Sequence, residues 1–267
     1  MGLVYHGSKE RGIKRLEPRK STHGVYVYAT PEKVLALIFS GRCGDDLTYS
    51  LGHFDTDKNG PWELVENIPL AFDKMFSNCS SIYSISDETF KDIHTGFAEV
   101  VSEVGVSVIK EEFCENVFEG ILDAEMEGLV KIYRYPNKPN CIKQDGSDIL
   151  DKWRYYKNKL NKVFGKNDFD RIIYLHPNLM GQINELLKEF GYDYHYEPDD
   201  LIEIFKARIE RQLQDSKHEQ YIESSYISIS NSFPELIPEI DKLYQYYNES
   251  VKAEKSFDTS KSEIGKS

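Results

Sequence analysis

A segment rich in proline, asparagine and glycine divides this sequence into two parts that follow different patterns. The segment 135–146 contains Pro136, Pro139 and Gly146, residue types that favour turns and end regular elements. Short runs of β-branched and aromatic residues, each bounded by turn residues, precede it. Longer runs with helical period follow it. The sequence therefore predicts an α+β domain followed by a mainly helical region.

The first part opens with two strands and a helix in close succession. Residues 3–8 form a short aromatic and β-branched run, and residues 24–30 form a second one that Pro31 ends. Residues 32–39 have helical period and stop at Ser40. Further expected elements are strands at 97–101, 104–109 and 129–135 and a helix at 112–127. This irregular mixture is typical of an α+β domain rather than of an alternating α/β one.

The second part is expected to contain several helices and then an irregular tail. The expected helices are residues 148–163, 179–190, 199–214 and 233–247. The last residues are rich in Ser, Lys and Glu, which is a composition typical of disordered segments. We therefore predict an N-terminal domain at 1–136, a helical region at 147–249 and a disordered tail at 250–267.

The charge balance limits the kinds of partner that this chain can bind. It has 33 Lys and Arg against 45 Asp and Glu, a formal net charge of −12. A protein that holds nucleic acid mainly through phosphates needs the opposite balance. The sequence has no apolar run near the roughly 18–20 residues that cross a bilayer, and its first residues lack the pattern of a signal peptide. We therefore expect a cytoplasmic protein without a membrane partner.

The cysteines are too far apart to suggest a metal site. Cys43, Cys79, Cys114 and Cys141 form no Cys-x-x-Cys motif, and no pair of histidines has ligand spacing. Disulfides would require an oxidising compartment, for which the sequence has no indication. We therefore expect buried free thiols and no bound metal.

Three motifs in the first part carry a family resemblance. They are Tyr5-His6-Gly7-Ser8, then Gly24-Val25-Tyr26-Val27-Tyr28-Ala29 before a helix with Ala36 and Ser40, and finally Phe97-Ala98-Glu99-Val100-Val101-Ser102. In this order they resemble the ADP-ribosyltransferase superfamily, in the branch typified by diphtheria toxin and the poly-ADP-ribose polymerases. That branch combines a His-Gly-Ser or His-Gly-Thr strand, a Gly-x-Tyr strand, a helix with small residues and a later strand with Glu. The resemblance implies an ADP-ribosyltransferase-like domain with a split mixed β-sheet.

The resemblance also assigns residues to an NAD site. It gives His6 a ribose hydroxyl on the adenosine side and gives Gly7 a backbone contact with the nicotinamide amide. Tyr26 is expected to stack on the nicotinamide ring, and Tyr28, on the same strand face, to close its other side. Ser8, next to Gly7, and Ser40, in the small-residue helix, complete the predicted set.

A basic loop supplies candidates for the pyrophosphate of NAD. Arg11, Arg19 and Lys20 lie in the charged segment between the first two strands, and no motif decides among them. We include Arg19 in the predicted NAD site. The alternative is that all three belong to a solvated loop.

Glu99 is the expected catalytic carboxylate, together with His6 and Tyr26. Cleavage of NAD at the nicotinamide ribose passes through an oxocarbenium-like centre, and a carboxylate stabilises the positive charge that develops there. Glu103 competes for this role because it lies four residues later, on the same face of a continuous strand. We prefer Glu99 because the residues that follow it resemble the pattern of the family.

The predicted function is that of an NAD-dependent mono-ADP-ribosyltransferase, with NAD as a substrate. Its acceptor is a macromolecule, and the acidic charge favours a protein over a nucleic acid. By analogy with other small chains of this kind, we expect a bacterial or phage toxin or defence effector with an antitoxin or inhibitor protein as its partner. Two alternatives stay open, an NAD glycohydrolase and a catalytically inactive binding module with the same fold.

Overall fold

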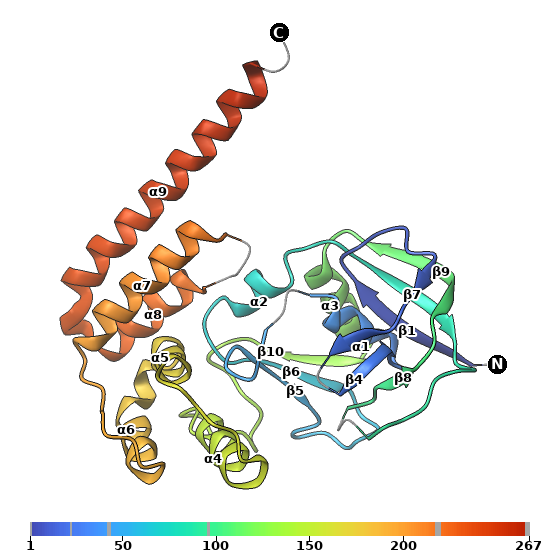
Figure 1. Cartoon of the computed structure of the whole chain (residues 1–267), viewed down its shortest axis with the longest axis horizontal. Coiled ribbons are helices and arrows are strands. Elements are labelled where there is room, and N and C mark those ends of the chain that lie inside the picture. Colours follow the sequence, from blue (N-terminus) through green and yellow to red (C-terminus); the bar gives the residue numbers. More distant parts are fainter. Residues whose placement is uncertain (1, 22, 42–43, 95–96, 217–219, 265–267) are drawn as a thin grey trace. The chain divides into compact units, whose positions relative to one another are not determined.

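The chain is described by a computed structural model that covers residues 2–21, 23–41, 44–94, 97–216 and 220–264 (Figure 1). The fold class is α+β, with 43% helix and 21% strand, as the sequence predicts. Two compact units are present. The first comprises Met1–Asp45, Leu51–Leu64 and Phe72–Ile132, and the second Asp46–Ser50, Val65–Ala71 and Tyr133–Ser267.

The unit boundary differs from the one we predicted near residue 136. Two short segments from the first part of the sequence belong to the second unit. The imidazole of His176 bonds the carbonyl of Leu47 across 2.7 Å, and the side chain of Asn67 donates to the carbonyl of Asp46. The first bond ties Leu47 to the helical part of the second unit, and the second bond joins the two early segments to each other. No local sequence pattern reveals either bond.

Antiparallel pairing organises the strands of the first part. The strands are β1 (Leu3–Ser8), β2 (Arg15–Leu16), β3 (Arg19–Ser21), β4 (Gly24–Ala29), β5 (Tyr49–Gly52), β6 (Trp62–Glu66), β7 (Ser80–Ser86), β8 (Val100–Ser102), β9 (Val106–Cys114) and β10 (Val130–Tyr133). They form sheets in the orders β1-β7-β9-β2, β3-β4-β8 and β10-β6-β5. The first two sheets bury a shared core of Val4, Leu16, Val27, Ala29, Ile85 and Val106.

The helices of the first part are short. They are α1 (Lys33–Phe39), α2 (Ala71–Met75) and α3 (Val117–Met126). The strands predicted at 3–8 and 24–30 and the helix at 32–39 are confirmed to within one residue. The helix predicted at 112–127 begins only at Val117, because Asn116 caps it by accepting from the backbone N–H groups of Phe118 and Glu119. The residues before this cap continue β9.

Gly7 allows α1 to pack closely on β1. A Cβ atom at this position would lie 1.9 Å from the carbonyl oxygen of Ala36 and 2.8 Å from Cβ of Ser40. Both neighbours belong to the buried side of α1 and its C-terminal end. The absence of a side chain at Gly7 therefore serves the contact between helix and strand.

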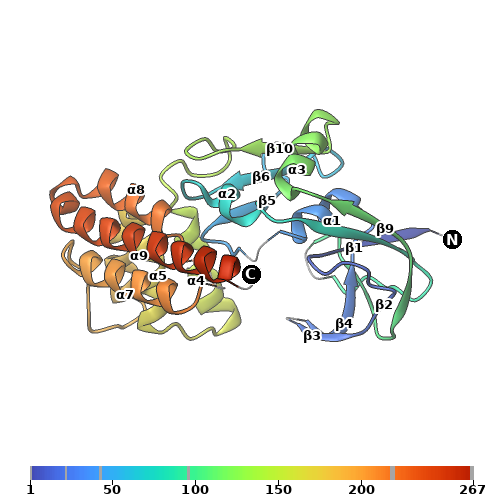
Figure 2. The same cartoon turned by 90° about the horizontal axis from the view of Figure 1, so that it is seen from above.

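The second part is helical, as predicted, but its helices differ in number and length. They are α4 (Asp148–Leu160), α5 (Lys166–Leu175), α6 (Met180–Glu189), α7 (Asp200–Gln214), α8 (Ile222–Ser232) and α9 (Ile237–Ile264). The sequence analysis did not predict α5 or α8. Both views show α7, α8 and α9 side by side (Figures 1 and 2).

The disordered tail that we predicted from residue 250 is instead part of a helix. α9 continues to Ile264. Between residues 239 and 264 the sequence has neither Gly nor Pro, the two residue types that most strongly interrupt helices. Ser, Lys and Glu are compatible with a helix that earlier residues have already started.

The cysteines are less buried than we predicted. Cys79 and Cys114 are free thiols, but Cys79 and Cys141 are exposed and Cys114 is half-buried. Cys43 lies outside the described residues. Within the described part of the chain, no helix has both the length and the apolar character that a membrane crossing requires.

The packing at Gly7 predicts a large effect of a small substitution. Gly7→Ala should lower the free energy of unfolding by about 1–3 kcal/mol, because the added methyl group overlaps α1. Chemical denaturation monitored by circular dichroism measures this change. Gly181→Ala is the matched control, since a Cβ there meets nothing within 4 Å inside α6, and it should stabilise by about 0.5–1 kcal/mol. Equal stability of the two variants would contradict the packing argument.

Candidate functional site

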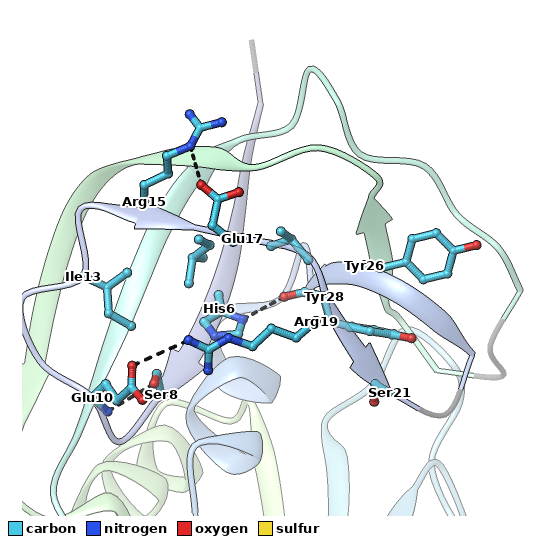
Figure 3. Close-up of a pocket in the computed structure, with 12 residues that line it drawn as sticks. His6, Ser8, Glu10, Ile13, Arg15, Glu17, Arg19, Ser21, Tyr26 and Tyr28 are labelled. Atoms are coloured by element: carbon cyan, nitrogen blue, oxygen red, sulfur yellow. Dashed lines mark hydrogen bonds and ion pairs between the residues drawn. The ribbon is translucent and has the colours of Figure 1, made fainter.

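A pocket of about 240 Å³ lies among β1, β2, β3 and β4 in the first unit (Figure 3). Five of the seven residues assigned to NAD from the sequence line it: His6, Ser8, Arg19, Tyr26 and Tyr28. They come from three strands, and all except Arg19 were selected from two motifs, residues 5–8 and 24–29. The fold thus brings most of the predicted NAD residues to one concave site.

His6 is held in a defined orientation at this pocket. Its Nδ1 lies 2.7 Å from the carbonyl oxygen of Tyr28 (Figure 3). A carbonyl only accepts, so Nδ1 carries the proton, and Nε2 of the neutral ring is left as an acceptor. Burial lowers the pKa of His6, and the positive charge of Arg19 lowers it further, although the bond to Tyr28 acts in the opposite direction. The neutral imidazole is thus suited to accept a hydroxyl proton.

Arg19 brings a positive charge to the pocket. Its Nη2 lies 4.0 Å from Oε2 of Glu10, and its side chain is 78% exposed, so this ion pair is weak. Arg11 instead stacks its guanidinium 3.7 Å from the centre of the Phe113 ring. Neither Arg11 nor Lys20 lines the pocket. Of the three candidates for the pyrophosphate, Arg19 is therefore the one at the pocket.

The two tyrosines of β4 contact each other rather than forming a slot. The ring centres of Tyr26 and Tyr28 are 6.0 Å apart and the rings are inclined by 78°. The hydroxyl of Tyr28 accepts the backbone N–H of His23 at 3.3 Å. In Figure 3 both rings extend away from His6. A nicotinamide ring sandwiched between them, as we expected, would require one ring to rotate.

Gly7 and Ser40 lie outside the pocket lining. Gly7 faces α1. Ser40 is 1% exposed, and its hydroxyl donates to the carbonyl of Leu37 at 2.6 Å and bonds the hydroxyl of Ser80 at 2.9 Å. Its small size therefore serves the contact between α1 and the sheet.

Glu99 lies immediately before β8, the strand that pairs with β4. Val100 is opposite Ala29 in this antiparallel pair, so continuing the register by one residue puts Glu99 opposite Thr30. Thr30 in turn pairs with Tyr5, beside His6. Glu99 is half-buried and forms no hydrogen bond or ion pair with another described residue. Its carboxylate does not line the pocket, and it lies two strands away from β1.

Glu103 has a different environment at the other end of β8. Its carboxylate bonds Nζ of Lys91 at 2.5 Å, and this contact lowers the pKa of Glu103. The same register puts it opposite Tyr26. Glu103 is thus an exposed member of an ion pair, whereas Glu99 has no such partner in the described chain.

The pocket also contains residues that the sequence analysis did not select. These are Glu10, Ile13, Arg15, Leu16, Glu17, Ser21 and Val27. Glu17 pairs with Arg15 at 2.7 Å. Both belong to a charged segment whose composition is typical of a solvated loop. Because β2 in this segment pairs with β9, the segment forms one wall of the pocket.

A carboxylate outside the pocket holds this wall in place. Glu111 on β9 accepts from the backbone N–H of Gly12 at 3.0 Å, from the hydroxyl of Ser81 at 2.7 Å and from that of Tyr83 at 3.0 Å. These bonds lower the pKa of Glu111, with the bond from Gly12 contributing most. The single hydroxyl proton of Tyr83 is shared, because the carbonyl oxygen of Glu10 also lies 2.7 Å from this hydroxyl. The loop before β2 is therefore fixed by long-range bonds.

No protein-family model, no curated protein and no solved structure matches this chain. The geometry of the site therefore carries the functional argument.

The buried imidazole predicts a particular pH dependence. The folded pKa of His6 lies below its usual value near 6.5, so both folded and unfolded chains are neutral at this position above that pH. Below it the unfolded state binds more protons, so the contribution of His6 to stability falls as the pH drops from about 6.5 towards the folded pKa and changes no further below it. An NMR titration of the imidazole should give a midpoint below 6.5. His6→Gln, which removes the titrating group, should flatten the corresponding loss of stability in acid; a normal midpoint would contradict the argument.

Proposed function

We propose that this chain is an NAD-dependent mono-ADP-ribosyltransferase whose first unit is an ADP-ribosyltransferase-like domain. One observation carries the proposal: five of the seven residues predicted from the sequence to bind NAD, from three strands, line a single pocket. β3 and β4 form a hairpin, and β1 reaches β4 only through its pairing with Thr30. The proposed substrate is NAD, and no metal takes part in the proposed chemistry.

The size of the pocket suits one half of the dinucleotide. At about 240 Å³ it is smaller than the roughly 300–1,000 Å³ of most small-molecule sites. The resemblance gives His6 the ribose on the adenosine side, and its free Nε2 is a suitable acceptor for a ribose hydroxyl. Arg19 supplies the positive charge for the adjoining pyrophosphate. We therefore assign the adenosine half of NAD to this pocket.

Glu99 takes the catalytic role in this proposal. The bond between C1′ of the nicotinamide ribose and the ring nitrogen breaks, and nicotinamide leaves with the electron pair. The carboxylate of Glu99 stabilises the positive charge on the ribose. The acceptor then attacks C1′ and gives up its proton to Glu99. Half-burial and the lack of a competing partner among the described residues support this choice over Glu103.

The proposed acceptor is a protein. The net charge of −12 disfavours a polynucleotide acceptor, which needs a basic surface. By analogy, we place the chain among bacterial or phage toxins and defence effectors with an inhibitor protein as partner. The edge-to-face contact of Tyr26 and Tyr28 supports the second candidate, a binding module that holds the adenosine half without turnover. The third, an NAD glycohydrolase, differs in using water as acceptor.

The carboxylate assignment is tested with labelled NAD and a cell lysate. Glu99→Gln should reduce transfer of label by about 10²-fold or more, while the affinity for NAD changes little, because the group acts on the transition state. Glu103→Gln is the matched control and should keep its activity. Full activity of Glu99→Gln refutes the catalytic assignment. Loss of activity in Glu103→Gln alone moves the role to that residue.

The same assay separates the three candidate functions. Label on a macromolecule with the wild-type chain supports the transferase. Release of nicotinamide without transfer supports the glycohydrolase, and binding without release supports the binding module. Absence of NAD binding rules out all three.

The role of Arg19 predicts a loss of affinity. Arg19→Gln should weaken NAD binding about tenfold, since a charge-assisted hydrogen bond to a phosphate contributes about 1.5–3 kcal/mol. Lys20→Gln is the control, because Lys20 is the exposed neighbour that does not line the pocket. Isothermal titration calorimetry of both variants measures the difference. An equal effect of the two substitutions would show that only general charge is involved.

A further inference from the structure

The second unit contains a polar pocket that takes no part in the proposed reaction. It has a volume of about 350 Å³ and lies between α5 and α7. Asn167 and Asp170 line it from α5, and Ala207, Arg208, Glu210, Arg211 and Gln214 line it from α7. Spacings of three and four residues put these side chains on one side of each helix. Buried apolar residues next to this side, including Phe169 and Phe205, anchor the two helices.

Two guanidinium groups, those of Arg208 and Arg211, line this pocket although the chain as a whole is acidic. Arg208 is half-buried and lies with its guanidinium carbon 5.6 Å from the centre of the Tyr174 ring. Burial lowers the pKa of Arg208, and the like charges of Arg171 and Arg211 lower it further, whereas Tyr174 and Asp170 act in the opposite direction. An anion between these groups would remove both penalties.

The acidic groups near the pocket leave the arginines largely available. Oδ1 of Asp170 already accepts from the hydroxyl of Tyr196 at 2.6 Å and from Nζ of Lys166 at 2.7 Å. Arg208 makes one long bond to Gln220, with 3.5 Å between the heavy atoms. Within the described residues, neither Arg208 nor Arg211 forms an ion pair.

We propose that this pocket binds the phosphate group of a small molecule. Guanidinium groups match phosphate oxygens with paired N–H donors, and the amides of Asn167 and Gln214 offer further donors at the same pocket. The net charge of −12 argues against a polynucleotide as the source of the phosphate. The site is independent of the proposed NAD pocket, because its lining residues all belong to the second unit.

Titration of the full chain with inorganic phosphate and with glycerol phosphate, at constant ionic strength, tests the proposal. Neither probe contains adenosine, so the NAD pocket of the first unit is not the expected target. NMR signals of the Arg208 and Arg211 side-chain N–H groups should shift saturably. Equal affinities would indicate that free phosphate is sufficient, and tighter binding of glycerol phosphate would indicate an organic phosphate.

Single substitutions locate the binding. Arg211 is exposed, so Arg211→Gln should leave the fold intact and weaken phosphate binding about tenfold or more. Arg154→Gln is the matched control, because that arginine pairs with Asp151 and Glu189 away from the pocket, and it should bind as the wild type does. Absence of saturable binding, or unchanged binding in Arg211→Gln, overturns the proposal. Tighter, strongly salt-dependent binding of a single-stranded oligonucleotide overturns it in favour of a nucleic-acid site.

Discussion

The pair of backbone hydrogen bonds between Tyr5 and Thr30 joins β1 to the end of β4, and the candidate NAD site depends on it. The N–H of Tyr5 donates to Thr30 at 2.7 Å, and the N–H of Thr30 donates back at 2.9 Å. This contact brings His6 within 2.7 Å of the carbonyl of Tyr28. It also aligns β8, and with it Glu99, two strands away from His6. One local pairing thus sets the spacing of all three predicted catalytic residues.

The opposite wall of the site depends on long-range polar bonds as well as on the apolar packing of Leu16. Glu111 and Tyr83 lie on the central strands of the largest sheet and bond the loop around Gly12. A charged loop tethered in this way keeps Arg19 and Glu10 at the rim of the pocket without burying them. Such a rim suits a charged ligand such as a dinucleotide, because its side chains stay hydrated until the ligand arrives.

The pockets of the two units are lined by different kinds of side chain. The first combines a neutral imidazole, two aromatic rings, two arginines and two glutamates at a pocket between strands. The second gathers guanidinium groups between two helices, in a chain of opposite net charge. Like charges held together repel each other, and this repulsion costs stability that a bound anion would restore. Asp170 and Glu210 also line this pocket and offset part of the repulsion, so the ligand is assigned from the paired N–H donors of Arg208 and Arg211 as well.

Much of the local structure was predictable from residue order. β1, β4 and α1 are defined by short strand-like runs, by helical period and by Pro31, and these signals act over a few residues. α5 was missed because its residues 172–175 form a continuous apolar run, which does not distinguish a helix from a buried strand. α8 was missed because its inner face is made of serines, among them Ser224 and Ser225, whose burial depends on neighbouring helices.

The sequence by itself determined the α+β class, the change to helices after residue 146, and the identity of His6, Ser8, Arg19, Tyr26 and Tyr28 as one group. Only the tertiary structure decided that Gly7 and Ser40 serve the packing of α1, that Glu10 and Glu17 line the pocket, and that α9 extends to Ile264. It also showed that Glu103 pairs with Lys91, whereas Glu99 has no such partner in the described chain. The physical reason is that the pattern of a few consecutive residues determines whether they form a helix or a strand. The neighbours of a side chain, however, come from distant segments, and a short stretch of sequence does not show which segments pair.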